Sequence, residues 1–374
     1  MNYKIVPHPL NITVEIPPSK SYFQRALICE FLSGEKCIDS NIYKSDDILA
    51  THNILNNKKE NSQLEMDCKD SASAFRFLVP VMGVLYDENV FILGNSLSKR
   101  PVDEFISVFQ KQNIEYRKEN NRFCIKGRLK PGNFRLKGNI SSQYVTGLLL
   151  ALPLLDEDSR IIIENYPVSK SYIDITLHIL NRFGIKIINN NYTEFIIKGK
   201  QKYTPCTYTP ERDWSGGAFW HFLKTKYSIK INGLTENSHQ PDSIVTKLLP
   251  NLPAIFSTEN CPDLVPCLCA YAIATEQSIK ITDCQRLKYK ECDRLSAMNE
   301  FKKLGADITT SDNEIIIGKN HSLRGGYVRS FSDHRMIMAY TLFAYLTELW
   351  VETDNINCIS KSYPDFFHIL NSEE

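Results

Sequence analysis

One pattern occurs three times in the chain: FQKQNIEYRKENNRFCIKG (residues 109–127), LNRFGIKIINNNYTEFIIKG (180–199) and FKKLGADITTSDNEIIIGK (301–319). Each stretch has the end of a helix, a β-rich run, a polar turn of Asn, Asp or Ser, and a second β-rich run. Gly184 and Gly305 stand where a helix C-cap is expected. The sequence therefore predicts a helix followed by a β-hairpin, three times over.

A second pattern lies upstream of these stretches. A polar loop opens an apolar helix six times, at Lys20, Asp70, Ser141, Asp213, Asp263 and Asp333. A short strand then follows, as in NVFILG, RIIIEN, YSIKING, QSIKITD and LWVETD. The helix starts recur at intervals of about 50 to 72 residues, which is long enough for a compound unit. The predicted unit is strand, helix, strand, helix and hairpin.

Two of the six units are expected to be shortened. The first, which runs to Gln63, and the fourth have little room for a hairpin, and the sixth ends at its second helix. Residues Tyr3 to Ile16 alternate like strands and are expected to supply missing strands to the C-terminal units. One domain is then discontinuous, with residues 1–17 plus 212–374, and the other has residues 18–211.

The bulk composition excludes some classes of protein. Lys plus Arg is 44 and Asp plus Glu is 43, so the sequence predicts neither nucleic acid nor an anionic membrane as a partner. No apolar run reaches the roughly 18 residues needed to span a bilayer, and the N-terminus has no signal pattern. An odd count of eleven scattered cysteines is typical of a reducing compartment. We expect a cytoplasmic protein that acts as a monomer.

Cations and hydroxyls gather at the predicted helix starts. Lys20 and Arg25 lie at the first start, and Lys290 and Arg294 are four residues apart, on one face if helical. A helix start carries free N–H groups and about half a positive charge. Starts that converge in a cleft between domains would bind anions, whereas separate starts are ordinary caps. Periodicity alone leaves both interpretations open. Lys20 and Arg25 could also be ordinary solvated charges, and Lys290 and Arg294 could belong to an intrahelical salt-bridge ladder.

Eight segments, taken together and in order, resemble the motif set of the EPSP synthase family. They are PPSKSYFQRAL, SKRP, KGNISSQYVTGLL, SKSYIDITL, CPDLVP, KYKECDRL, FSDHRMIMA and SKSYPDFF, and they run from residue 17 to residue 368. The resemblance implies an α/β (α+β) fold, a two-domain inside-out α/β barrel of six βαβαββ-type units. Two of those units are shortened here.

The resemblance also implies substrates and roles for single residues. One set is expected to bind shikimate 3-phosphate: Lys20, Ser21, Arg25, Ser141, Ser142, Gln143, Ser169, Tyr172, Asp263 and Lys290. A second set is expected to bind phosphoenolpyruvate: Lys20, Ala72, Arg100, Gln143, Arg294, Arg335 and Lys361. Asp263 matches the proton acceptor and Glu291 the proton donor of the family, and Lys20 is a third catalytic candidate.

The implied reaction transfers the enolpyruvyl group of phosphoenolpyruvate to the 5-hydroxyl of shikimate 3-phosphate and releases phosphate, as in aromatic amino acid biosynthesis. It is expected to need neither a metal nor an organic cofactor. Glyphosate inhibits the family at the phosphoenolpyruvate site, close to the position of Ala72.

The chain departs from the family pattern in one loop. The family usually has Asn-Ala-Gly-Thr-Ala where this chain has Asp70-Ser71-Ala72-Ser73-Ala74. Asp70 adds a negative charge on the phosphoenolpyruvate side, and Ala72 adds a methyl group. This loop and the shortened units suggest an alternative, a family member that binds anions or a partner without turnover. A second alternative is the sister enzyme that transfers enolpyruvyl to UDP-N-acetylglucosamine.

Overall fold

The structure is a computed structural model that describes residues 2–38, 45–56, 64–319 and 322–372. Its internal contacts divide the chain into two compact units. Unit 1 comprises Met1–Pro17 and Glu211–Glu374, and unit 2 comprises Pro18–Pro210. The expected end of the shortened first repeat, at Gln63, lies outside the described residues.

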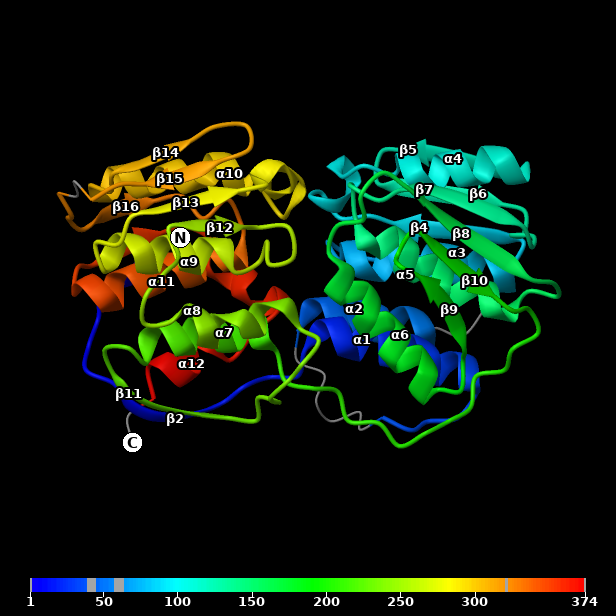
Figure 1. Ribbon diagram of the computed structural model, residues 1–374, viewed down its shortest axis with the longest axis horizontal. Coiled ribbons are helices and arrows are strands. Elements are labelled where there is room, and N and C mark those ends of the chain that lie inside the picture. The colour runs from blue at the N-terminus through cyan, green and yellow to red at the C-terminus, as the bar shows by residue number, and fades with distance from the viewer. Residues whose placement is uncertain (1, 39–44, 57–63, 320–321, 373–374) are drawn as a thin grey trace. The chain divides into compact units, whose positions relative to one another are not determined.

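Unit 2 contains two four-stranded sheets of the same topology (Figure 1). One has the order β3-β4-β6-β5, with β3 (Leu64–Asp67), β4 (Glu88–Ile92), β5 (Glu115–Glu119) and β6 (Arg122–Lys126). The other has the order β7-β8-β10-β9, with β7 (Asn133–Lys137), β8 (Ser159–Glu164), β9 (Ile187–Asn190) and β10 (Glu194–Ile197). In both sheets the first pair is parallel and the other two pairs are antiparallel.

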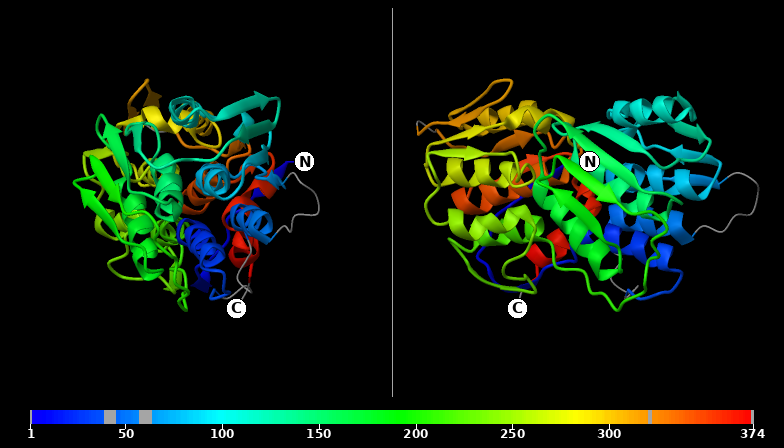
Figure 2. Two further views of the ribbon diagram at one scale, coloured as in Figure 1. Left: turned by 90° about the vertical axis from the view of Figure 1, so that its right-hand side faces the viewer. Right: turned by 45° about the vertical axis from the view of Figure 1, so that its right-hand side comes forward.

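The helices of unit 2 pack against these sheets (Figure 2). They are α1 (Lys20–Ser33), α2 (Asp46–Asn56), α3 (Ala72–Leu85), α4 (Asp103–Gln112), α5 (Ser142–Ala151) and α6 (Lys170–Arg182), with 3₁₀ helices η2 (Leu97–Lys99) and η3 (Leu152–Leu154). Burial alternates along β7, so one sheet face packs on helices and the other faces solvent. Helices α3 and α5 are apolar on nearly all sides and are correspondingly buried.

Unit 1 repeats this sheet once and adds two smaller sheets. The four-stranded sheet has the order β12-β13-β15-β14, with β12 (Ile255–Ser257), β13 (Ile279–Thr282), β14 (Ile308–Thr310) and β15 (Ile315–Ile317). The three-stranded sheet has the order β1-β17-β16, with β1 (Tyr3–Ile5), β16 (Gly326–Val328) and β17 (Val351–Thr353). Strand β2 (Asn11–Glu15) pairs in parallel with β11 (Ser228–Asn232).

Three long apolar helices form the core of unit 1: α7 (Trp214–Leu223), α9 (Val265–Ala274) and α11 (His334–Thr347). The remaining helices are short: α8 (Val245–Leu248), α10 (Arg294–Ala297) and α12 (Phe366–Leu370), with 3₁₀ helices η4 (Pro241–Ile244), η5 (Cys284–Tyr289), η6 (Met298–Leu304) and η7 (Ile356–Lys361). Within the described residues, none of the helices is both long and apolar enough to cross a membrane.

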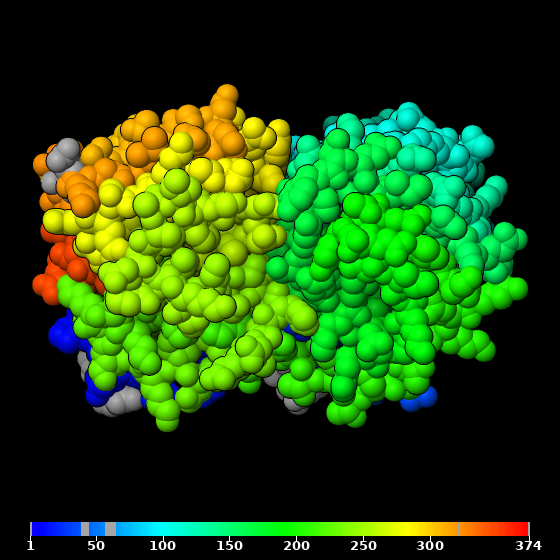
Figure 3. All heavy atoms as spheres, viewed as in Figure 1, coloured from blue at the N-terminus to red at the C-terminus, as the bar shows by residue number. Residues whose placement is uncertain are grey.

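The repeated pattern read from the sequence is confirmed. Strands β5–β6, β9–β10 and β14–β15 form the three antiparallel hairpins, and Gly184 and Gly305 adopt the left-handed conformation that a helix end requires. The N-terminal strands also pair as expected, β1 with β17 and β2 with β11. In Figure 3 the N-terminal residues, in blue, lie at the molecular surface beside green residues of unit 1.

Candidate active site

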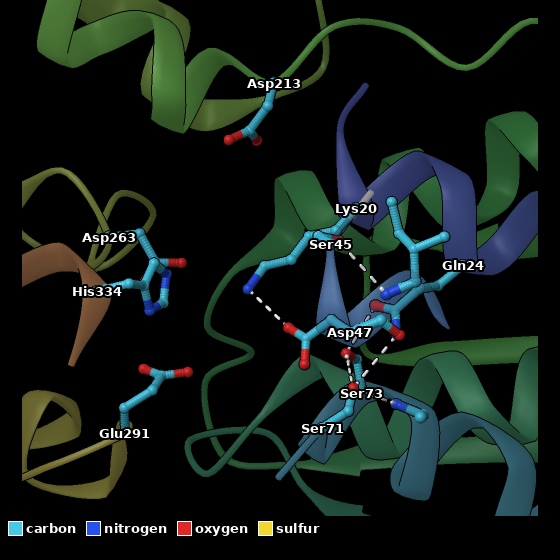
Figure 4. A network of polar contacts seen from close by, with 12 residues as sticks. Lys20, Gln24, Ser45, Asp47, Ser71, Ser73, Asp213, Asp263, Glu291 and His334 are labelled. Carbon is cyan, nitrogen blue, oxygen red and sulfur yellow. Dashed lines mark hydrogen bonds and ion pairs between the residues drawn. The ribbon is translucent and has the colours of Figure 1, made fainter. Parts of the chain in front are cut away.

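The start of α1 in unit 2 carries an ion pair. Lys20 Nζ lies 2.8 Å from Asp47 Oδ2, from the first turn of α2, and Asp47 is buried (Figure 4). The lysine side chain stays about one-fifth exposed, at 21%. A partly exposed ammonium group beside a buried carboxylate can exchange that carboxylate for an anionic ligand.

Gln24, one turn later on α1, fixes the neighbouring helix starts (Figure 4). Its Nε2 donates to the backbone oxygen of Asp47 and to Thr51 Oγ1, both at 2.8 Å. Its Oε1 accepts from Ser73 Oγ at 2.7 Å, and Ser71 Oγ caps α3 by accepting from the Ala74 N–H. The amide therefore ties α1 to the starts of both α2 and α3.

Arg25 is a buried cation, 2% exposed, whose described hydrogen bonds all go to neutral acceptors. These acceptors are Thr176 Oγ1 at 2.7 Å, the Ser21 backbone oxygen at 2.6 Å, and Thr146 Oγ1 and the Tyr172 backbone oxygen at 3.3 Å each. Burial lowers the pKa of Arg25 to about 10 because little negative charge offsets the desolvation of the guanidinium. The site thus keeps a positive charge that an oxyanion can neutralise.

A second buried guanidinium, Arg76 on α3, orients Gln143 at the start of α5. Arg76 Nη1 donates to Gln143 Oε1 at 2.8 Å, which leaves the amide N–H groups of Gln143 to point elsewhere. Burial, and the nearby charge of Arg100, lower the pKa of Arg76. Ser141 caps the same helix by accepting from the Gln143 N–H at 3.3 Å, and Ser142 is buried beside it.

The departing loop before α3 uses its acidic residue to hold a neighbouring loop. Asp70 Oδ1 accepts from the backbone N–H groups of Ser96 and Leu97, at 2.9 and 3.0 Å. Ser96 and Leu97 stand at the start of η2, and Arg100 directly follows that helix. Ala72 is buried as the first residue of α3. Asp70 Oδ1 thus accepts hydrogen bonds from the backbone of the loop that carries Arg100.

The last two predicted residues of unit 2 lie at the start of α6. Ser169 precedes the helix in the left-handed conformation, at φ 55°, and is buried. Tyr172 lies in the first turn, and its backbone oxygen accepts from Arg25. Arg25 therefore links the starts of α1 and α6.

The predicted residues of unit 1 meet around Arg294. Its guanidinium contacts three carboxylates: Nη1 donates to Asp263 Oδ1 at 2.6 Å, Nη2 to Glu291 Oε2 at 2.7 Å, and Nε to Asp333 Oδ2 at 2.7 Å. Lys290 Nζ lies 3.2 Å from the same Asp263 oxygen. Figure 4 shows the side chains of Asp263 and Glu291.

This cluster shifts the titration of its members. Burial acts to raise the pKa of Asp263, but Lys290, Arg294 and Arg335 hold it well below its ordinary value. Burial lowers the pKa of Lys290 in spite of Asp263. These three cations therefore hold Asp263 in its ionised form.

Arg335 is a buried cation of unit 1 with weak described contacts. It is 2% exposed, Nη1 contacts the weak acceptor Met338 Sδ at 3.5 Å, and Nη2 lies 3.6 Å from Asp213 Oδ2. Its buried Nε has no hydrogen-bond partner within the described residues. Lys361 ends η7, which packs on α11, the helix that carries Arg335.

One conditional expectation about this unit is wrong. Lys290 and Arg294 do not share a helix, because α10 begins only at Arg294 and Lys290 is extended. They converge on Asp263 through the loop instead. The sequence offered no reason to select Asp47, and Asp213 was recognised only as a helix start, where it accepts from the Gly216 N–H at 2.8 Å. Asp333 was recognised only as a helix start, a role it keeps by accepting from the Arg335 N–H at 2.8 Å.

Comparisons with known proteins agree with these observations. The model of a family described as EPSP synthase (3-phosphoshikimate 1-carboxyvinyltransferase) matches residues 6–254 and 250–370. A protein of Clostridioides difficile (strain 630) named 3-phosphoshikimate 1-carboxyvinyltransferase is 39% identical, over 97% of this chain and 95% of its own. A protein of Clostridium perfringens (strain 13 / Type A) with the same name is 37% identical, over 98% and 97%.

Solved structures share the fold. An EPSP synthase structure from Acinetobacter baumannii superposes with a TM-score of 0.77 at 19% identity, and covers 99% of this chain and 97% of that one. The mixed α/β architecture is therefore that of solved EPSP synthases. With a family model that spans nearly the whole chain and relatives of this identity, the chain belongs to the EPSP synthase family.

Proposed function

We propose that this chain transfers the enolpyruvyl group of phosphoenolpyruvate to the 5-hydroxyl of shikimate 3-phosphate and releases phosphate. The hydroxyl oxygen attacks C2 of phosphoenolpyruvate while C3 takes up a proton, which gives a tetrahedral intermediate. The intermediate then loses a proton from C3 and the C2–O bond to phosphate breaks. Product and phosphate leave, and no electron acceptor or donor takes part.

The observation that carries the proposal is the buried, uncompensated charge of Arg25. Its hydrogen-bond partners are neutral, and burying a cation without a counter-ion costs several kcal/mol. A phosphate group offers the acceptors and the negative charge that this guanidinium lacks. Shikimate 3-phosphate supplies such a group on a small polyhydroxylated ring.

Unit 2 supplies most of the proposed shikimate 3-phosphate site. Arg25, Lys20 and Ser21 bind from α1, and Ser141, Ser142 and Gln143 bind from the start of α5. Ser169 and Tyr172 bind from the start of α6. Asp263 and Lys290 of unit 1 complete the set. The hydroxyl and amide groups suit the ring hydroxyls, and the cations suit the phosphate.

The proposed phosphoenolpyruvate site uses cations of both units. Lys20, Ala72, Arg100 and Gln143 contribute from unit 2, and Arg294, Arg335 and Lys361 from unit 1. Arg335 has weak partners in the unliganded protein, so it is ready for an anion. Arg294 contacts three carboxylates, so the ligand must displace at least one of them.

The proton steps are assigned to two of the three carboxylates that contact Arg294. Asp263 accepts the proton of the 5-hydroxyl, and Glu291 donates the proton to C3. Shikimate 3-phosphate draws Lys290, and phosphoenolpyruvate draws Arg294, away from Asp263, so the depressed pKa of Asp263 rises when a base is needed. Lys20 stabilises the developing charge after leaving Asp47.

The finer fold assignment is part of the same proposal. We assign the chain to an inside-out barrel of six βαβαββ-type units, two of them shortened, with units 1 and 2 as its two domains. The enzyme works as a monomer in aromatic amino acid biosynthesis. A reducing compartment, the cytoplasm, is supported by the eleven cysteines, all free thiols.

Product analysis tests the proposal against both alternatives. Mass spectrometry of reactions with phosphoenolpyruvate and one acceptor should find an enolpyruvyl ether of shikimate 3-phosphate only. An ether of UDP-N-acetylglucosamine would indicate the sister activity. A protein that binds shikimate 3-phosphate by calorimetry yet forms no ether with either acceptor is a binding protein without turnover.

A further inference from the structure

Unit 1 contains a buried carboxyl group that the proposed reaction leaves unused. Asp242 lies on η4 and is 0% exposed. Its Oδ2 accepts from Ser215 Oγ, on α7, at 2.5 Å. Its Oδ1 is buried without a hydrogen-bond partner in the described part of the chain. An ionised carboxylate has about four acceptor positions, so a single hydroxyl satisfies it poorly.

The charges around Asp242 come from three other elements. Asp213 at the start of α7, Asp263 in the loop before α9 and Arg335 on α11 each act on Asp242 electrostatically. Arg335 Nη2 lies 3.6 Å from Asp213 Oδ2, and Asp213 is two residues before Ser215, which donates to Asp242. The thiols of Cys261 and Cys267 also lie within its electrostatic reach. Burial, and then the charge of Asp263, raise the pKa of Asp242 to about 7, against the opposing effects of Ser215 and Arg335. Asp242 therefore exchanges its proton near neutral pH.

The unsatisfied atoms of Arg335 and Asp242 are complementary, since one is a donor and the other is an acceptor. Among the residues that the structure describes, the buried Nε–H of Arg335 has no acceptor and the buried Oδ1 of Asp242 has no donor. The two attract one another, because each shifts the titration of the other towards the charged form. An ionised Asp242 thus compensates the charge of Arg335 while no ligand is bound.

We propose that Asp242 is a positioning residue for Arg335 and binds a proton as phosphoenolpyruvate enters. An anion bound to Arg335 neutralises the positive charge that ionised Asp242 otherwise compensates. An ionised Asp242 would then face the ligand, Asp213 and Asp263 together, and a proton removes that repulsion. The inference rests on the proposed function, since it takes Arg335 as a ligand for phosphoenolpyruvate.

The sign of the pH dependence follows from this coupling. Phosphoenolpyruvate favours the protonated form of Asp242, so its affinity is highest below the pKa of that group. Affinity then falls as pH rises through about 7 and Asp242 ionises. If Asp242 only anchored Ser215, its substitution would change the affinity by the same factor at every pH.

The test is the KM for phosphoenolpyruvate, from phosphate release at saturating shikimate 3-phosphate, between pH 6 and 9. Asp242→Asn mimics the protonated form of Asp242. Phosphoenolpyruvate itself ionises in this pH range, but that effect is the same for both proteins and cancels in the ratio of their KM values. The KM of the parent divided by that of Asp242→Asn should rise by roughly ten-fold between pH 7 and 8.5. Asp312→Asn, an exposed change in the same unit, should give a ratio that does not vary with pH.

Ser215→Ala is the second variant, and it keeps the carboxyl group. The Ser215 hydrogen bond stabilises the ionised form, so its loss should move the rise in KM to higher pH. A KM ratio of parent to Asp242→Asn that does not vary with pH overturns this inference alone. If Asp242→Asn does not fold, a rise in the KM of Ser215→Ala at the same pH as in the parent overturns it instead. Absence of turnover in the parent overturns the proposed function and this inference with it.

Discussion

At the scale of single residues, Asp263 is the group on which the proton transfer depends. Replacement by Ala removes the base but leaves Arg294 held by Glu291 and Asp333. We expect Asp263→Ala to lower kcat by about 10²–10⁴-fold, with little change in the dissociation constant of shikimate 3-phosphate. Phosphate release and calorimetry measure the two quantities.

Asp312→Asn serves as the control, since its carboxylate pairs with Lys288 at the surface. It should leave both quantities unchanged, because exposed ion pairs contribute little. Near-normal turnover in Asp263→Ala would show that another group accepts the proton.

The methyl group of Ala72 is a second single-residue feature of the predicted phosphoenolpyruvate site. It is buried at the start of α3, where the family usually has Gly, and a packed site yields to an added methyl group only at a cost of about 1–3 kcal/mol. We expect weak inhibition of the parent by glyphosate. Ala72→Gly should strengthen inhibition by about ten-fold, on the order of 1.4 kcal/mol. Equal inhibition constants for the two proteins would mean that the methyl group points away from the ligand.

At the scale of elements, Asp70 links two loops that carry the phosphoenolpyruvate side of unit 2. Its carboxylate holds the start of η2, and Arg100 follows that helix. Asp70→Ala removes two hydrogen bonds of about 0.5–1.5 kcal/mol each and should raise the KM for phosphoenolpyruvate by about ten-fold. The change acts through the position of Arg100, so the affinity for shikimate 3-phosphate should stay near that of the parent.

Asp70→Asn separates this role from the effect of charge. The amide oxygen can accept from the same two N–H groups, so its KM should stay close to that of the parent. If repulsion by the carboxylate dominates, Asp70→Asn should instead lower the KM clearly. A parent-like KM in Asp70→Ala would contradict the positioning role.

The elements that the sequence predicted well are those fixed by local residues. The hairpins follow from β-rich runs on either side of polar turns, and Gly184 and Gly305 mark the helix ends. The path from Lys290 to Arg294 was harder, because residues four apart suggest a helix. In the structure both side chains reach Asp263, and this tertiary contact leaves the chain between them non-helical.

The site was predicted as a set of cations and hydroxyls with the carboxylates Asp263 and Glu291, and two other buried carboxylates were missed. Asp47 and Asp242 lie in ordinary polar segments with no local signal. Their importance comes from contacts with Lys20 and Ser215, which are 27 residues away in each case. Only the folded chain identifies such partners.

At the scale of the whole molecule, the chain leaves unit 1 at Pro17 and returns at Glu211. The two passages are joined by a hydrogen bond from the Asp213 N–H to the Pro17 oxygen at 2.8 Å. Strands β1 and β2 complete sheets of unit 1 with β17 and β11. The N-terminal residues thus belong to the fold of the unit that contains Asp263 and Arg335.

The central claim, that this chain is a working enolpyruvyl transferase, is tested most directly by one initial-rate measurement. Phosphate release is followed with phosphoenolpyruvate alone, with shikimate 3-phosphate alone, and with both at saturation. We predict steady release only with both, in amounts equal to the enolpyruvyl ether formed. No release with both substrates, from protein that circular dichroism shows to be folded, would contradict the account.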